Sequence, residues 1–274
     1  IMRRGRYKNL KWSVFKMRHT SAELKRLSRE HLNGHWGLAI GANLLVGLLT
    51  SAILMPFYFL LVLSGMGMVQ MVTYSIATVI VTAVSMILQC GIIRMYFGFS
   101  RNQESSIGMM FSEFTRRPER YILGFLFLVC VEVICMLPGA ICLSVGITTG
   151  IVLAAIIGVI LYLTGMAALV LIALRMSQMF MLMVDHSDMG VMEAYHRSVE
   201  MMEGNKGRYF YINLSFIGLS LLGMLSCGIG MLWVTPYMMQ TSVNFYRELN
   251  GELDQEQGSG VFWNGQEYVP KKEL

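Results

Sequence analysis

Charge is what this chain has least of. Charged residues make up 14% of its 274 residues and apolar residues 55%, whereas ordinary soluble domains have about 25% and about 45–50%. Side chains with so little charge cannot cover the water-exposed surface of a soluble protein of this length. The composition therefore excludes a soluble globular protein and predicts an integral membrane protein.

Paired cysteines and catalytic motifs are also missing. The five cysteines lie in apolar stretches and form no C-x-x-C pair, which argues against a disulfide framework or a zinc site. The sequence has no phosphate-binding glycine-rich loop, no nucleophile elbow and no paired carboxylates at helical spacing. We therefore predict that the protein is not an enzyme and needs no cofactor and no metal.

Three long stretches are almost free of charge. Residues 38–93 and 209–246 contain no charged side chain, and residues 121–174 contain only Glu132. Each stretch is longer than the roughly 20 residues that cross a bilayer once, so each must double back. This pattern predicts an all-α membrane bundle of six transmembrane helices arranged as three hairpins. The turns are expected at small residues, in segments 64–67, 144–150 and 226–230.

The third stretch is the shortest, and its second half is polar. Thr235, Pro236, Gln240 and Asn244 interrupt its apolar character. A single span followed by an interfacial helix is therefore the alternative for residues 209–246.

The segments between these stretches are basic, whereas the expected turns carry no charge. By the positive-inside rule, the N-terminus, both connections and the C-terminus then lie in the cytoplasm. The basic N-terminal arm indicates attraction to anionic lipid headgroups rather than to nucleic acid. The basic residues of the connections are Arg94, Arg101, Arg116, Arg117 and Arg120 in the first, and Arg175, Arg197, Lys206 and Arg208 in the second.

An amphipathic helix is expected before each hairpin, which indicates an internal repeat. Thr20 and Glu23 have the spacing of a capping box that opens the first of these helices. The first and third helices match at a fixed offset, as in Ser28 with Ser198 and Gly34 with Gly204. We expect these helices to lie at the cytoplasmic membrane interface. The predicted organisation is a basic arm (1–18), a membrane domain (19–249) with units 19–100, 104–185 and 188–249, and an acidic, disordered tail (250–274).

Glu132 is the main candidate for a functional side chain. An ionised carboxylate in the middle of a span costs several kcal/mol unless it is protonated or paired, so it is a candidate proton or cation site. The alternative is a structural glutamate that fixes helix contacts. Its candidate partners are Gln89, Asn43 and Asn213.

Two further sets of residues have candidate roles. Arg94 and Arg175 follow the apolar stretches directly, where they could bind an anionic substrate or, more simply, lipid headgroups. Gly228, Gly230 and Pro236 interrupt the third hairpin and are candidate hinges.

Two motifs resemble a known family. The segment Asn33-Gly34-His35-Trp36-Gly37 and the segment Gly228-Ile229-Gly230-Met231-Leu232-Trp233 are similar to those of the bacterial integral-membrane family called domain of unknown function 975. The likeness covers residues 20–250 and leaves the basic arm and the acidic tail outside. It implies a multi-pass protein of the bacterial cytoplasmic (inner) membrane, and it implies no activity, substrate or catalytic residue.

The sequence thus predicts a non-enzymatic membrane protein with a scaffold or assembly role. Its expected partners are the lipid bilayer, anionic lipid headgroups, and another membrane protein or a second copy of the chain. The alternative function is a small transporter or permease subunit with its ion site at Glu132.

Overall fold

The computed structural model describes residues 19–65, 67–253, 261–263 and 268–270. The basic arm, residues 1–18, lies outside the described residues. The elements in chain order are α1 (Ser21–Leu32), α2 (Trp36–Leu63), α3 (Met68–Ser100), the 3-10 helix η1 (Ile107–Phe114), α4 (Glu119–Thr149), α5 (Val152–Met176), α6 (Met179–Asp185), α7 (Val191–Met201), α8 (Lys206–Leu214), α9 (Ile217–Leu225), α10 (Met231–Leu249), β1 (Val261–Trp263) and β2 (Tyr268–Pro270). The two short strands pair antiparallel with each other.

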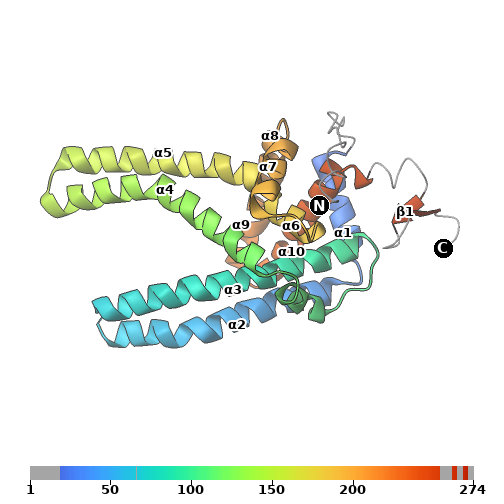
Figure 1. The fold of residues 1–274 in the computed structure, drawn as a ribbon, viewed down its shortest axis with the longest axis horizontal. Helices are drawn as coiled ribbons and strands as arrows, with labels where there is room; N and C mark the ends of the chain where they lie inside the picture. The colour runs from blue at the N-terminus through green and yellow to red at the C-terminus, as the bar shows by residue number, and fades with distance from the viewer. Residues whose placement is uncertain (1–18, 66, 254–260, 264–267, 271–274) are drawn as a thin grey trace, which may run out of the picture.

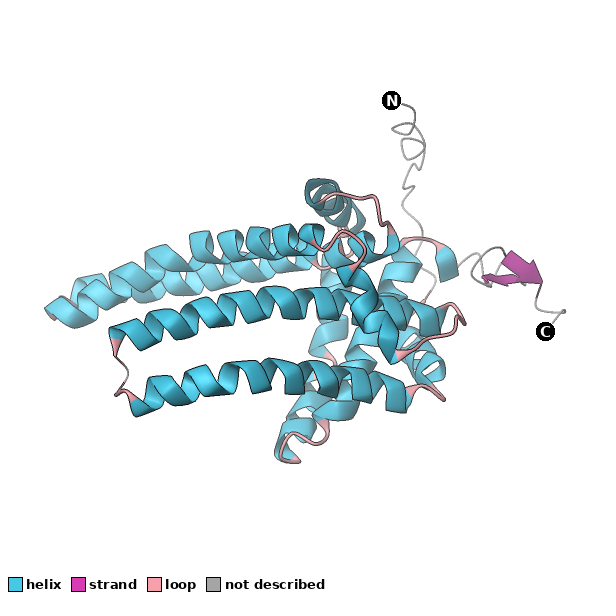
Figure 2. Ribbon diagram, turned by 60° about the horizontal axis from the view of Figure 1, so that its bottom comes forward, coloured by secondary structure: helices cyan, strands magenta, loops and turns pink. Residues whose placement is uncertain are grey.

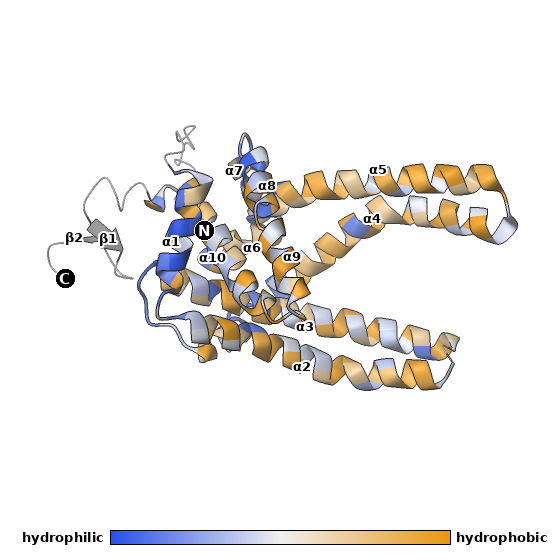
Figure 3. Cartoon of the chain, turned by 180° about the vertical axis from the view of Figure 1, so that it is seen from behind, coloured by the Kyte–Doolittle hydropathy of each residue, from blue (hydrophilic) through white to orange (hydrophobic). Residues whose placement is uncertain are grey.

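Two long helical hairpins extend from one end of the molecule. α2 packs along α3, and α4 packs along α5; both hairpins reach the far end, as Figure 1 shows. The shorter helices lie toward the opposite end (Figure 1). The part of this end that is formed by α1, η1, α6, α7 and the C-terminal parts of α3 and α10 is called the base. Figure 3 shows that the hairpins are mostly hydrophobic along their length. The prediction of an all-α, multi-span membrane fold is therefore confirmed.

One predicted turn lies later than expected. The sequence places it across residues 144–150, but α4 continues to Thr149 and turns at Gly150, which has a φ of 72°. The hydroxyls of Ser144 and Thr148 donate hydrogen bonds to carbonyls of the preceding helical turn. Because these hydroxyl groups find hydrogen-bond acceptors within the helix, the two residues do not end it.

The third apolar stretch does not form the regular hairpin expected. Among the residues that the structure describes, five segments are long and apolar enough to cross a membrane: α2, α3, α4, residues 152–185 and residues 206–225. The last of these is broken into α8 and α9 at Ser215 and Phe216. α10 is not among the five, because its C-terminal half contains polar and charged side chains such as Gln240, Asn244 and Arg247. The arrangement of six spans in three equal hairpins is therefore not confirmed.

Both ends of the third stretch nevertheless return to the base. Arg208, near the start of α8, pairs with Glu248, near the end of α10, at 2.7 Å. Neither α8–α9 nor α10 runs to the far end of the molecule with the two long hairpins (Figures 1 and 2). The third stretch thus leaves the base and returns to it, but it extends less far from the base than the two long hairpins do.

The three helices that precede the apolar stretches, α1, η1 and α7, each pack on the helix that closes another unit. α1 packs on α10, η1 on α3, and α7 on α6. In two of these pairs a buried serine makes the contact: Asn244 donates to Ser28 Oγ at 2.9 Å, and the Gln178 amide donates to Ser198 Oγ at 3.2 Å. The leading helix of each later unit therefore packs on the unit before it, and the leading helix of the first unit packs on the third unit.

The predicted repeat is visible in these elements. Ser28 and Ser198 are both fully buried, and Gly34 and Gly204, which follow α1 and α7, have φ values of 81° and 77°. Only glycine adopts this left-handed conformation at little cost. The capping box of α1 is also present, since Thr20 Oγ1 accepts from the Glu23 amide and the Glu23 carboxylate accepts from the Thr20 amide.

Close contact between α4 and α5 depends on glycines. A Cβ on Gly158 would lie 2.4 Å from the Leu143 amide nitrogen, and one on Gly146 would lie 2.3 Å from that of Ala155. Small residues allow helix backbones to approach closely in membranes, where packing replaces the hydrophobic effect as the driving force. The hairpin is thus held by backbone proximity along its outer half.

We expect Gly158→Ala to destabilise the protein by about 1–3 kcal/mol, because the added methyl group forces α4 and α5 apart. Gly47→Ala in α2 is the matched control, since a Cβ there meets nothing within 4 Å. Thermal unfolding in detergent measures both. Equal stability of the two variants would contradict the packing described here.

Candidate functional site at the base

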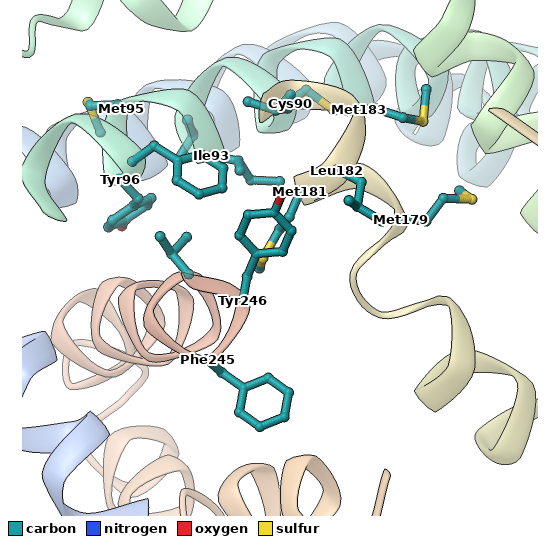
Figure 4. Packing of buried hydrophobic residues seen from close by; sticks show 14 of the residues in the cluster. Cys90, Ile93, Met95, Tyr96, Met179, Met181, Leu182, Met183, Phe245 and Tyr246 are labelled. Carbon is teal, nitrogen blue, oxygen red and sulfur yellow. The ribbon is translucent and has the colours of Figure 1, made fainter. Parts of the chain in front are cut away.

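The closing helices α3, α6 and α10 converge in an apolar core inside the base. Figure 4 shows Tyr246 of α10 pointing between Ile93 of α3 and Met181 of α6, whereas Phe245 points away from them. Phe97 packs edge-on against Tyr246, with ring centroids 5.4 Å apart. This core brings the polar ends of three distant segments within reach of one another.

An ion network joins these three helix ends. Arg101, which follows α3, donates to Asp185 of α6 at 2.7 Å and to Glu252 at 2.7 Å. Arg247 of α10, with no exposed surface, donates to the same Glu252 at 3.0 Å and to the Ser100 carbonyl at 2.8 Å. Two arginines thus face two carboxylates, and the Tyr246 hydroxyl donates to Asp185 at 2.9 Å.

Glu252 is the centre of this network. Burial by itself would raise the pKa of Glu252, but Arg101 and then Arg247 hold that pKa down at about 2. The carboxylate is therefore ionised at neutral pH and belongs to the folded base, although it lies beyond the membrane domain that the sequence predicts. Residues 250–253 are part of the base.

A second polar cluster holds η1 and the start of α4. Glu113, with no exposed surface, accepts hydrogen bonds from Arg94 and from the Tyr121 hydroxyl. Arg94 also donates to the Val184 carbonyl at 2.9 Å. Arg120 donates to Tyr121 and to two backbone carbonyls in the segment after α6. The buried Glu113 carboxylate thus has Arg94 as its counter-ion, and Arg120 is connected to it through the Tyr121 hydroxyl.

Helix α1 is attached to α10 by a third polar set. His31 Nδ1 lies 3.1 Å from Asn244 Oδ1, and the Asn244 amide donates to Ser28. The amide of His19 donates to Glu248 at 3.2 Å. Burial, and then the positive charge of Arg247, lower the pKa of His31 to about 4 in spite of its bond to Asn244. His31 is therefore neutral at physiological pH.

Glu132 does not meet its predicted partners. It is exposed on α4, and it makes no hydrogen bond or ion pair within the part of the chain that the structure describes. Asn43 donates to the Ala39 carbonyl and to Tyr96, and Asn213 donates to the Tyr209 carbonyl. Gln89 is half-buried in α3. The expected structural cluster around Glu132 is absent from the described residues.

The two candidate headgroup arginines differ. Arg94 is occupied by Glu113 inside the base, so the structure gives it a packing role. Arg175 is exposed at the end of α5 and remains available to headgroups.

The three candidate hinge residues lie in two different places. Gly228, with a φ of 82°, and Gly230 lie at the tip of the third stretch, whereas Pro236 is buried within α10.

Sequence reasoning missed three acidic residues of the base: Glu113, Asp185 and Glu252. Glu113 stands in the apolar stripe of η1, between Met110 and Phe114, and that position was the one available signal. Asp185 and Glu252 resemble ordinary solvated loop residues in the sequence. Only the convergence of α3, α6 and α10 gives them arginine partners.

One comparison with known proteins found a match. A family model described as "Protein of unknown function (DUF975)" matches residues 17–252. The chain belongs to this family. Neither a curated protein nor a solved structure matches the chain. The match covers the whole membrane part and the base of this DUF975 protein, including Glu252, and it ends there.

We expect Glu113→Leu to destabilise the DUF975 protein by up to about 3 kcal/mol, because the partly buried Arg94 loses its counter-ion. Adding Arg94→Leu should recover part of this loss, since the double variant buries neither charge. Unfolding in detergent of the wild type, both single variants and the double variant gives the coupling energy. Losses that simply add would show that the pair is not coupled.

Acid should weaken the attachment of α1. An unfolded histidine takes up a proton near pH 6.5, whereas folded His31 does so only near pH 4. The unfolded state therefore binds more protons between these values, and the contribution of His31 to stability falls as pH falls from about 6.5 to about 4. His31→Gln should flatten this part of a plot of melting temperature against pH. An unchanged slope would contradict a buried, neutral His31.

Proposed function

We propose that this protein is a non-enzymatic membrane scaffold whose base lies in the cytoplasm and whose hairpins bind a span of another membrane protein. The single observation that carries the proposal is Glu132, an exposed carboxyl group in the middle of α4 that has no partner among the described residues. Two features of the fold support it.

The first supporting feature is the way α4 leaves α5. Cys135 and Gly139 face α5, since a Cβ on Gly165 would lie 2.1 Å from the Cys135 carbonyl oxygen and one on Gly139 would lie 2.5 Å from the Tyr162 amide. Glu132 precedes them by three and seven residues, so helical periodicity puts it on the same side of α4. Below this point α4 bends away from α5, as Figure 1 shows. Pro138 lies within the helix near the bend.

Closer to the base, α4 packs on α3 and α7 and contacts side chains of α6. Gly124 faces Phe180 and Met179, with a Cβ position 3.1 Å from the Phe180 ring. Glu132 is therefore exposed where α4 and α5 have separated. A charged side chain at mid-membrane costs about 2.5–3.5 kcal/mol or more. A polar or cationic side chain at the same depth on a partner span would remove this cost.

The second supporting feature is the rigidity of the base. The network of Arg101, Asp185, Arg247 and Glu252 connects the ends of α3, α6 and α10. The spacing of the two hairpins is then set by the base together with the packing of α4 on α3. A fixed spacing of this kind suits a protein that holds a partner span in one position.

The cytoplasmic orientation rests on charge. Arg116, Arg117 and Arg175 are exposed at the base, and the basic segment 1–18 directly precedes it. The turns at the far end carry no charged side chain. Positive charge flanking spans is retained on the cytoplasmic side.

A photo-crosslinking amino acid at Val129, one turn from Glu132, tests the scaffold proposal in native membranes. We expect a discrete protein adduct that Glu132→Ala reduces at least about tenfold, which corresponds to about 1.4 kcal/mol of binding. Ile134, which is 72% exposed on the other side of α4, is the control position and should give no such adduct.

Two outcomes would contradict the scaffold proposal. One is an adduct whose yield does not change with Glu132→Ala. The other is proton or solute flux through the purified protein in liposomes that Glu132→Gln abolishes, which would support the transporter alternative instead.

A further inference from the structure

The 3-10 helix η1 differs from the other two leading helices in what it exposes. Ile107, Phe111 and Phe114 are 44%, 46% and 38% exposed. In α7 the large apolar side chain with comparable exposure is Met192, and α1 has none. The sequence predicts an amphipathic helix before each hairpin, but of α1, η1 and α7 only η1 exposes a cluster of large apolar side chains.

The opposite face of η1 is fixed to α3. A Cβ on Gly91 would lie 2.2 Å from the Met110 carbonyl oxygen, so the two backbones touch. Met110 and Glu113 are both fully buried, and Glu113 is held by Arg94. Because the face with Met110 and Glu113 is held against α3, η1 cannot rotate to bury its phenylalanines.

The contact with α3 also sets the depth of η1 in the membrane. Residues 38–93 carry no charge, and Arg94 is the first charged residue that follows. The boundary between the hydrocarbon and the headgroups therefore lies near Gly91 and Arg94. η1 packs beside these two residues, so Phe111 and Phe114 lie at the level where aromatic side chains are enriched in membrane proteins.

Positive charge follows η1 directly. Arg116 and Arg117 are both exposed. Arg117 has a φ of 58° and pairs with Glu119 at 3.2 Å on the surface. Arg116 makes no ion pair with any residue that the structure describes. The loop therefore has an excess of positive charge next to an apolar face at headgroup depth.

We propose that η1 and the Arg116–Arg117 loop form a docking site for anionic phospholipids of the leaflet that contacts the base. The phenylalanines enter the upper acyl region, and the two guanidinium groups bind lipid phosphates. A lipid fits this surface better than a protein does, because the surface lies at the depth of the lipid headgroups. The site does not depend on the scaffold function, since it lies on α3 rather than at Glu132.

The site can be tested with a photo-crosslinking phenylalanine analogue at Phe111. The full-length protein is placed in nanodiscs with equal amounts of phosphatidylglycerol and phosphatidylcholine, and the lipid adducts are identified by mass spectrometry. We expect phosphatidylglycerol adducts to exceed phosphatidylcholine adducts at least about fivefold, with the excess falling in high salt. The same analogue at Ile134, in the middle of α4, should report the bulk lipid ratio.

Paired substitutions identify the residues responsible. Arg116→Gln with Arg117→Gln should return the adduct ratio at Phe111 to the bulk value while the lipid adducts persist. Arg26→Gln with Arg29→Gln removes two exposed positive charges from α1 and should leave the ratio unchanged. The proposal fails if the wild-type ratio equals the bulk ratio, if both pairs lower it equally, or if Phe111 gives no lipid adduct.

Discussion

The fold depends on the pairing of charges buried between helix ends. Arg247 has no exposed surface, and Glu252 and the Ser100 carbonyl accept hydrogen bonds from its guanidinium group. The same carboxylate binds Arg101, which also binds Asp185. Four side chains from three segments therefore neutralise one another, and removal of one leaves an uncompensated charge in a poorly solvated site. This requirement brings the ends of α3, α6 and α10 together.

The leading helices extend this constraint around the base. Ser28 binds α10, Glu113 binds α3, and Ser198 accepts from Gln178 beside α6. Each unit is thus connected to the one before it, whereas the outer halves of the hairpins contact chiefly their own partner helix. A protein built in this way is rigid at one membrane face and open within the membrane. Glu132 is exposed because it lies in the open part within the membrane, and the phenylalanines of η1 are exposed because they lie on the outer surface of the base.

Several features could be predicted because their causes are local. The capping box of α1 needs only Thr20 and Glu23, and the turn at residues 64–67 needs only small residues between two apolar runs. Asn43 and Asn213 bond to residues other than Glu132, because a polar residue type does not by itself tell which helices pack together. Arg94 was expected to reach headgroups, but it turns inward to Glu113, whose burial depends on contact between η1 and α3.

The sequence by itself determined that this is a helical membrane protein and where its first hairpin turns, because uncharged length and small residues act without distant contacts. The tertiary structure decided the rest. It made α10 part of the base rather than a sixth regular span, gave Asp185 and Glu252 their arginines, and left η1 as the leading helix with an exposed apolar face. These outcomes depend on which helix ends meet, and such contacts between residues far apart in the chain leave no periodic signal in it.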